Sequence, residues 1–405
     1  MPSFSGGAWK FVFGLTFCAA LADSEIARGQ TIGTDWLDQN RGNMASADGP
    51  TLSRSARASF RAGAEYAFTD NVFLNATAQS DSSLVGWAQG SFELATSTID
   101  FMTAAMANYS AYLNARASSS DEERALLRVG VAGPSFSLQL SDVVRREVDP
   151  VDVVFVNVAR RVANDFMPRA SVNLHPFKLE LTSSIQVVVF TDDFFGTERN
   201  NFNHRSQLLL AVEVLPFFEV TADASILGFQ YFGDTPDADG FALRAGVRGA
   251  LGRNLVLSAS VGGVALESDP EPITGEPGNA AKLGFEGRAR YEPTSDLTLT
   301  LDVGQRTTFG AGDSSFATAT QTLLLAEYRA TPDVTLGFRS QVDRLEPEQD
   351  ASRYYVSLSA SARIALSQAI TVDLRPSFRT SSVEVVTGAG AYQNFLLRVG
   401  LIFSV

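Results

Sequence analysis

Apolar and polar residues alternate through most of the chain, most regularly towards its C-terminal end. In 394–405 one face of an extended chain is apolar (Phe395, Leu397, Val399, Leu401, Phe403) and the other carries Asn394, Arg398, Gly400 and Ser404. Successive side chains of a strand point to opposite faces, so this pattern predicts an amphipathic strand. The same alternation recurs in 205–214, 243–248, 297–306, 356–364 and 370–379.

Connections between these segments alternate in length. Short turns are predicted at 215–216, 252–254, 293–296, 331–333 and 367–368, and longer loops at 191–203, 231–240, 267–279, 309–316, 344–352 and 380–390. Short turns at one rim and long loops at the other are typical of bacterial outer-membrane barrels. Residues 53–405 are therefore predicted to form an all-β, transmembrane, antiparallel up-and-down β-barrel of about 18 strands, within a range of roughly 14–20. A soluble β-sandwich also alternates, but seldom with so regular a rhythm.

Two segments of the N-terminal third do not follow a simple pattern. In 84–115 large residues such as Trp87 and Met102 fall on both faces, and 146–162 reads equally as a strand or as part of a loop. The strand count in this region is therefore left open.

The N-terminus has the features of an export signal. Lys10 precedes the apolar run 11–22, which ends in Ala20-Leu21-Ala22. Such a run with a small-residue cleavage motif predicts a signal peptide over 1–22, followed by a polar lead-in over 23–52. The run is short for a transmembrane anchor, which needs about 20 apolar residues. Phe17 before Cys18 disfavours a lipid-anchored cysteine. Cleavage would remove the single cysteine, and with it disulfides and thiol chemistry.

Composition agrees with a barrel and argues against a nucleic-acid binder. Hydrophobic residues make up 45% and charged residues 19%, and the mean hydropathy is +0.03. Strands that alternate lipid-facing and lumen-facing residues give such an average. The formal net charge is −13, whereas nucleic-acid binding usually needs a basic surface.

The polar faces of the predicted strands are rich in arginine. Twelve arginines are predicted to line a pore: Arg205, Arg244, Arg248, Arg288, Arg290, Arg306, Arg329, Arg339, Arg363, Arg375, Arg379 and Arg398. Acidic residues are fewer on these faces, and the predicted long loops are instead acidic. A row of arginines in a water-filled lumen attracts anionic or saccharide solutes. The alternative is that each arginine pairs with a neighbouring acid and only satisfies a polar interior.

Catalytic, cofactor and metal sites are not predicted. Only His175 and His204 could act as a histidine base. His175 is predicted in a turn and His204 in or near a long loop, where Asp192 or Asp193 could pair with it in an outer-rim hydrolase. A solvated loop histidine is the simpler interpretation. No cysteine–histidine cluster or phosphate-binding glycine loop is present.

The segment Glu65–Leu74 reads as a strand, a turn at Thr69-Asp70-Asn71 and a second strand. In these letters, and in its later alternation, the chain resembles the type-2 outer-membrane β-barrel porin family, which includes barrels found with exopolysaccharide and PEP-CTERM surface systems. The resemblance implies a role in surface-polysaccharide export and partners among exopolysaccharide export components. One departure is the terminal Val405, where such barrels usually end in an aromatic residue.

The sequence thus predicts an integral barrel of the cell outer membrane that forms a passive or partner-gated channel and is not an enzyme. The alternatives are an occluded structural or anchoring barrel without transport and, less favoured, an outer-membrane hydrolase. Expected partners are outer-membrane lipid, lipopolysaccharide and the barrel-insertion machinery, with no nucleic acid and no cofactor.

Overall fold

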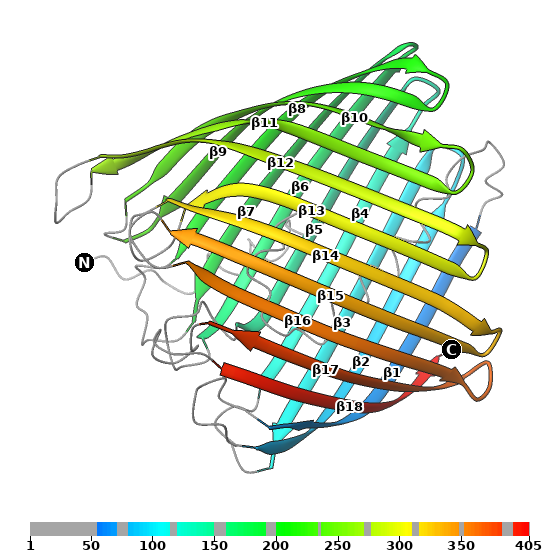
Figure 1. The fold of residues 1–405 in the computed structure, drawn as a ribbon. Coiled ribbons are helices and arrows are strands. Elements are labelled where there is room, and N and C mark those ends of the chain that lie inside the picture. The colour runs from blue at the N-terminus through cyan, green and yellow to red at the C-terminus, as the bar shows by residue number, and fades with distance from the viewer. Residues whose placement is uncertain are drawn as a thin grey trace, which may run out of the picture.

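The structure, a computed structural model, describes residues 55–70, 80–113, 120–149, 159–191, 200–233, 236–270, 277–309, 316–347, 352–382 and 392–404. These residues form one sheet of 18 strands (Figure 1). The strands are β1 (Ser55–Thr69), β2 (Asp81–Ala95), β3 (Ile99–Tyr112), β4 (Ser120–Ala132), β5 (Phe136–Asp149), β6 (Ala159–Leu174), β7 (Phe177–Phe190), β8 (Asn201–Leu215), β9 (Phe218–Tyr231), β10 (Ala238–Leu251), β11 (Leu255–Pro270), β12 (Pro277–Thr294), β13 (Leu297–Phe309), β14 (Phe316–Thr331), β15 (Val334–Pro347), β16 (Arg353–Ala365), β17 (Ile370–Ser381) and β18 (Tyr392–Ser404).

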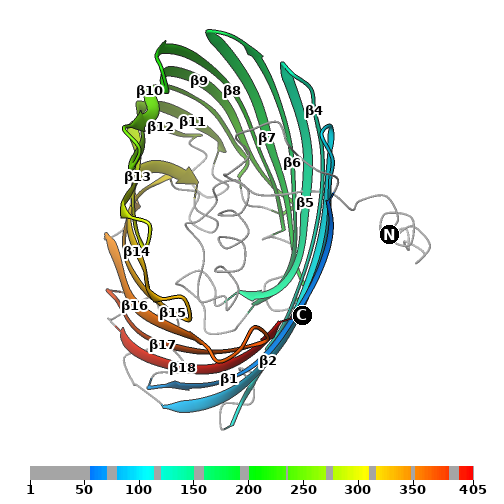
Figure 2. The same cartoon turned by 90° about the vertical axis from the view of Figure 1, so that its right-hand side faces the viewer.

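Each strand pairs antiparallel with its sequence neighbours, and β18 pairs with β1 to close the sheet. The closing register runs from Arg61 opposite Ser404 to Thr69 opposite Leu396. Closure leaves no open sheet edge, so every strand has a ladder partner on both sides. Viewed nearly end-on, the barrel is elongated in cross-section, with β8–β11 near one end and β18, β1 and β2 near the other (Figure 2). The predicted fold and the strand number of about 18 are confirmed for the described part of the chain.

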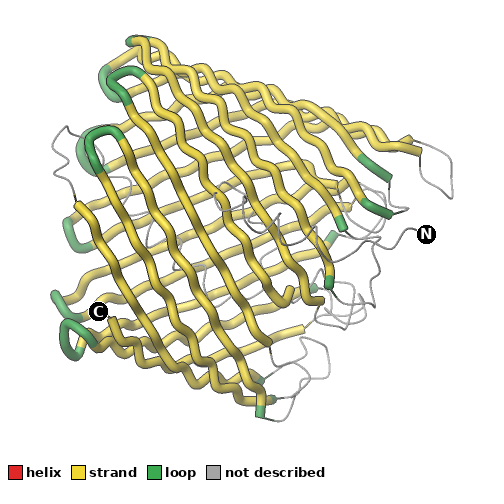
Figure 3. Tube along the Cα trace, turned by 180° about the vertical axis from the view of Figure 1, so that it is seen from behind, coloured by secondary structure: helices red, strands yellow, loops and turns green. Residues whose placement is uncertain are grey.

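The two rims differ as predicted. Two-residue turns join β6 to β7, β8 to β9 and β14 to β15, and they lie at the same rim as the C-terminus (Figures 1 and 3). The long connections lie at the opposite rim. Strands run further into these connections than the sequence indicated, because paired ladders continue past the apolar belt. Residues 238–240 and 267–270, predicted as loop, belong to β10 and β11.

The outward face of the barrel is apolar. Leu283, Ile226 and Leu243 are 75%, 63% and 57% exposed, and each lies on the face opposite the arginines of its own strand or its neighbour. Outward apolar side chains over a closed sheet are suited to lipid, because all backbone groups are already hydrogen-bonded within the wall. Among the described residues, no helix is long and apolar enough to cross a membrane.

The outward face of β5 carries a carboxylate. Asp142 lies opposite Leu127 and Phe166, on the lipid-facing side of β5, yet is only 2% exposed. The side-chain amide of Asn164 donates a 2.6 Å hydrogen bond to it. A buried carboxylate is tolerated where donors satisfy it, so this pair keeps the charge inside the wall and away from lipid.

The mixed pattern of 84–115 has a structural explanation. The stretch contains most of β2 and all of β3, and the inward face of β3 carries Met102 and Ala104. These residues pack with Leu126, Val143 and Met167 in an apolar cluster on the inner side of the wall. Because both faces of these strands carry apolar residues, alternation alone could not assign them. In 146–162, β5 ends at Asp149 and β6 begins at Ala159, and 150–158 lie outside the described residues.

The predicted turn at Thr69-Asp70-Asn71 begins where β1 ends. The backbone N–H of Phe395 donates to Asp70 Oδ1 over 2.6 Å, and the backbone N–H of Asp70 donates to the Phe395 carbonyl over 3.1 Å. Asp70 therefore ties the end of β1 to β18 at the closing seam. Residues 71–79, the predicted signal peptide and the lead-in lie outside the described residues, so these remain predictions.

Candidate functional site: the inner wall of the barrel

Ladder pairing identifies the inward face on every strand. Residues directly opposite one another lie on the same side of a sheet, so one row can be followed from Glu180 through Leu209 and Asp223 to Arg244. Extended around the barrel, this rule places all of the predicted arginines on the inward face: Arg205, Arg244, Arg248, Arg288, Arg290, Arg306, Arg329, Arg339, Arg363, Arg375, Arg379 and Arg398.

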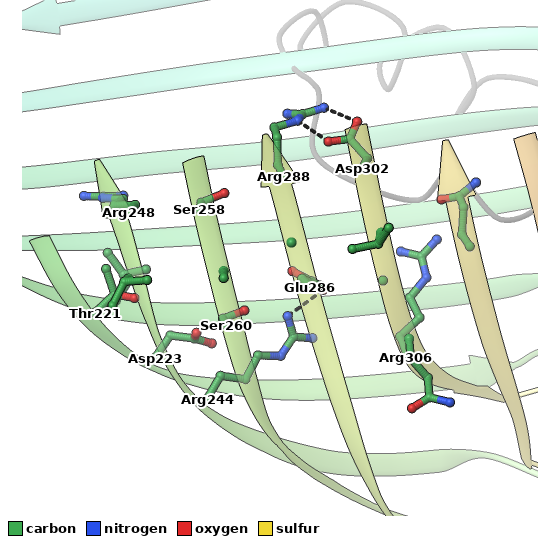
Figure 4. Close-up of a pocket in the computed structure, with 18 of the residues that line it drawn as sticks. Thr221, Asp223, Arg244, Arg248, Ser258, Ser260, Glu286, Arg288, Asp302 and Arg306 are labelled. Carbon is green, nitrogen blue, oxygen red and sulfur yellow. Dashed lines mark hydrogen bonds and ion pairs between the residues drawn. The ribbon is translucent and has the colours of Figure 1, made fainter. Parts of the chain in front are cut away.

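A recess of ≈ 380 Å³ lies in this wall between β8 and β14, and Figure 4 shows its side chains. Arginines and polar residues line it, among them Arg244, Arg248, Arg288 and Arg306 with Gln207, Ser260 and Gln321. The arginines arise from the strand alternation, which directs every second side chain inward. The recess brings together four of the twelve predicted residues.

Ion pairs organise these arginines. Arg288 binds Asp302 through two bonds, Nε to Oδ1 at 2.5 Å and Nη2 to Oδ2 at 2.9 Å. Arg244 Nη1 lies 2.6 Å from Glu286 Oε1, and Figure 4 shows this pair beside the first. Two-point guanidinium–carboxylate bonds fix the side chain as well as its charge. The sequence alone left open that the arginines pair with neighbouring acids instead of standing free in the lumen. Such pairs are present at Arg288 and Arg244 in this recess.

A second basic group lies near the closing seam. Arg375 stands directly opposite Arg398 on the neighbouring strand, and Arg379 lies on the same face four residues further along β17, beyond Ser377. Arg375 Nε donates to Asp373 Oδ2 at 2.7 Å, and Arg363 Nε is 3.7 Å from the same oxygen. Arg398 interacts electrostatically with Arg379, Arg375, Glu65 and Tyr112. Like charges on adjacent strands make this sector of the wall locally positive.

The remaining predicted arginines are spread along the wall. Arg339 Nη2 donates to Gln341 at 2.9 Å, and Arg290 Nη2 pairs with Glu292 at 2.6 Å. Arg205 lies opposite Leu227 on β9, and Arg329 is near the short-turn end of β14. The twelve residues therefore do not form one site.

Sequence reasoning missed the basic residues on the inward face of β4–β7. Arg145 Nη2 is 2.6 Å from Asp165, and Arg128 Nη2 is 2.9 Å from Asp100. Arg169 and Lys178 both reach Glu180. The apolar inner cluster around Met102 obscured the alternation in this region. The pairs Arg124 with Leu126 and Arg145 with Val143, spaced by two, are the signal that could have placed them inward.

The hydrolase alternative gains no support from the histidine positions. His204 was predicted in or near a long loop, and it lies near the start of β8, opposite Ile185 and Gly228 on the outward face. Strand β8 continues up to Asn201 because its ladder with β7 and β9 extends that far. His175 does lie in the turn between β6 and β7, 3.3 Å from Glu213. Within the described ranges, no three His, Cys, Asp or Glu residues are arranged to hold a metal ion.

Comparisons with known proteins extend only to the fold. No family model matches the sequence, and no curated protein matches it. Among solved structures, OccAB1 of Acinetobacter baumannii aligns over 89% of this chain and 98% of its own, with 11% identity and a TM-score of 0.47. A BenF-like porin from Pseudomonas fluorescens Pf-5 aligns over 87% and 99%, with 10% identity and a TM-score of 0.48. OccK2 (OpdF) of Pseudomonas aeruginosa aligns over 87% of this chain and 98% of its own, with 11% identity and a TM-score of 0.47. At these values the likenesses carry no argument about function.

The class of protein follows from the chain's own structure. A closed 18-stranded antiparallel sheet with an apolar outer face and a charged inner wall is a transmembrane β-barrel. Barrels of this design are integral proteins of the cell outer membrane, with short turns on the periplasmic side. The resemblance to the type-2 porin family stays a prediction.

Proposed function

We propose that this barrel is a passive outer-membrane channel that favours small anionic solutes. The observation that carries the proposal is the solvent exposure of arginines on the inner wall. The side chains of Arg288 and Arg290 are 60% and 47% exposed, although carboxylates neutralise part of their charge. Positive groups along a water-filled wall raise the local concentration of anions.

Conductance in a planar bilayer tests this proposal. The purified barrel is expected to insert as stable conductance steps, with a reversal potential in a KCl gradient that favours chloride. Cation preference would contradict the proposed selectivity, and an absence of steps from folded protein would contradict the channel itself.

A second candidate, an occluded structural barrel, is favoured by one observation. Inward side chains of the N-terminal wall are covered: Met102 is 1% exposed and Ala104 is 3% exposed. Covered inner side chains narrow the space open to solute on that side. The bilayer measurement separates the two candidates, because an occluded barrel inserts without conductance.

A role in surface-polysaccharide export is the finer proposal. Its support is the resemblance of Glu65–Leu74 to exopolysaccharide-associated barrels. Exopolysaccharide export components, lipopolysaccharide and the barrel-insertion machinery are the proposed partners. Loss of surface polysaccharide on deletion of the gene, restored by the wild-type copy, is expected; unchanged polysaccharide would contradict this role.

A further inference from the structure

Glu180 is the centre of a group of ion pairs near the short-turn rim. Its carboxylate, with a side chain only 6% exposed, meets Arg169 at 2.6 Å, Lys178 at 2.7 Å and Arg248 at 3.1 Å. The three cations come from β6, β7 and β10. Of the acidic residues described so far, Glu180 has the largest number of basic ion-pair partners.

The bond to Arg248 crosses two intervening strands. The row beside Glu180 runs from Lys178 through Ala211 and Thr221 to Gly246, so small side chains lie between the two partners. Ala211 is 0% exposed and Thr221 is 8% exposed. The wall also bends around β8–β11 at one end of the elongated cross-section, which brings β7 towards β10 (Figure 2). Small residues and curvature together let the long Arg248 side chain reach Glu180.

The charges in this group are unequally exposed. The side chains of Arg169, Lys178 and Arg248 are 53%, 33% and 31% exposed, whereas Glu180 is buried beneath them. Arg248 also bonds to Glu219 through Nε. A carboxylate in such a position neutralises one charge and also holds three flexible side chains against the wall.

We propose that Glu180 sets the ion selectivity of the periplasmic half of the lumen by tethering Arg169, Lys178 and Arg248. This inference rests on the proposed channel function. Without the carboxylate, the local charge rises by one, and Arg169 and Lys178 extend into the lumen while Arg248 keeps its bond to Glu219. Both effects increase the preference for anions, because the freed cations no longer have their common counter-ion.

Glu180→Gln tests the tether, because it keeps the side-chain shape and removes the charge. The ratio of anion to cation permeability is expected to rise by roughly twofold or more at low salt. Glu286→Gln is the matched control, because Glu286 pairs with Arg244 and should give a smaller shift. A shift in Glu180→Gln no larger than in the control would overturn the inference.

Lysine labelling provides a readout that does not depend on conductance. The chain contains only three lysines, Lys10, Lys178 and Lys282, so Lys282 serves as an internal reference. In the folded barrel, a water-soluble amine reagent is expected to label Lys178 several-fold faster in Glu180→Gln than in wild type, relative to Lys282. If the labelling rate of Lys178 relative to Lys282 is the same in Glu180→Gln and wild type, the tether is overturned, whether or not the wild-type protein conducts. If the wild-type protein does not conduct, the proposed channel function is overturned, and the labelling result still tests the tether.

Discussion

Arg288 and Asp302 form a two-point ion pair on the inner wall, yet the guanidinium side chain remains 60% exposed while the carboxylate side chain is 24% exposed. The pair therefore presents its positive member to the lumen. A side chain fixed in this way keeps its charge at a defined place, which distinguishes it from a freely moving surface arginine.

Substitutions in this pair should move ion selectivity in opposite directions. Asp302→Asn removes the counter-charge and should raise the anion-to-cation permeability ratio by about twofold at low salt. Arg288→Ser removes the exposed cation and should lower the ratio by a similar factor. Reversal potentials in a KCl gradient measure both. Ser258→Ala, an uncharged change in the same recess, is the control and should leave the ratio unchanged.

The basic group near the seam allows a second selectivity test. Arg375→Ser together with Arg379→Ser should weaken anion preference, because two cations are lost from this part of the inner wall, one of them the nearer partner of Asp373. The matched control is Arg344→Ser. Arg344 lies opposite Tyr354 on the outward face, with its guanidinium 5.5 Å from the ring centre, so its loss should leave the lumen unaffected. Equal reversal potentials for the double variant and wild type would refute the role of this arginine group.

The assignment of faces predicts where a charge can be tolerated. Leu243→Arg places a charge on the lipid-facing side of β10, and should destabilise the folded barrel by about 2–4 kcal/mol. Gln207→Arg places the same residue on the inner wall and should change stability by less than about 1 kcal/mol. Unfolding by urea in lipid vesicles, followed by tryptophan fluorescence, gives both values. Equal losses would mean that the two faces are wrongly assigned.

The close packing of the outward His204 against Gly228 predicts that substitutions at these two positions have coupled effects on the stability of the barrel. A Cβ added at Gly228 would lie 2.1 Å from His204 Cε1 and 2.8 Å from Asp239 Oδ1, so the imidazole occupies space that only glycine leaves open. Gly228→Ala should destabilise the barrel by about 1–3 kcal/mol, because the ring must shift. His204→Ala should remove much of that cost in the double variant. The same urea measurement, as a double-mutant cycle, tests this coupling; purely additive effects would argue against the contact.

Much of the architecture could be predicted because the strands of a barrel wall have one face towards lipid and one towards water, and this difference appears as a local alternation of apolar and polar residues. In β17 and β18 lipid and water impose opposite demands on successive side chains, so residues 370–379 and 394–404 show their faces directly. The turns at Pro216 and Pro332 were predictable for a similar reason, since proline disrupts a ladder and marks its end.

Other features depended on neighbours that the sequence does not identify. Alternation failed around Met102 because the inner wall there is apolar and buried, and both faces then look alike. His204 could be predicted only as in or near a long loop, because nothing local shows how far β8 continues once the ladder with β7 and β9 is formed.

Alternation by itself determined that the strands are amphipathic and that these arginines lie on the face opposite the apolar residues, because side-chain direction in a strand is a local property. Only the tertiary structure decided which acid each arginine meets, since partners such as Asp302 and Arg288 depend on register. It also decided that Glu180 and Arg248 come into contact, because curvature and small intervening residues bring non-adjacent strands within reach.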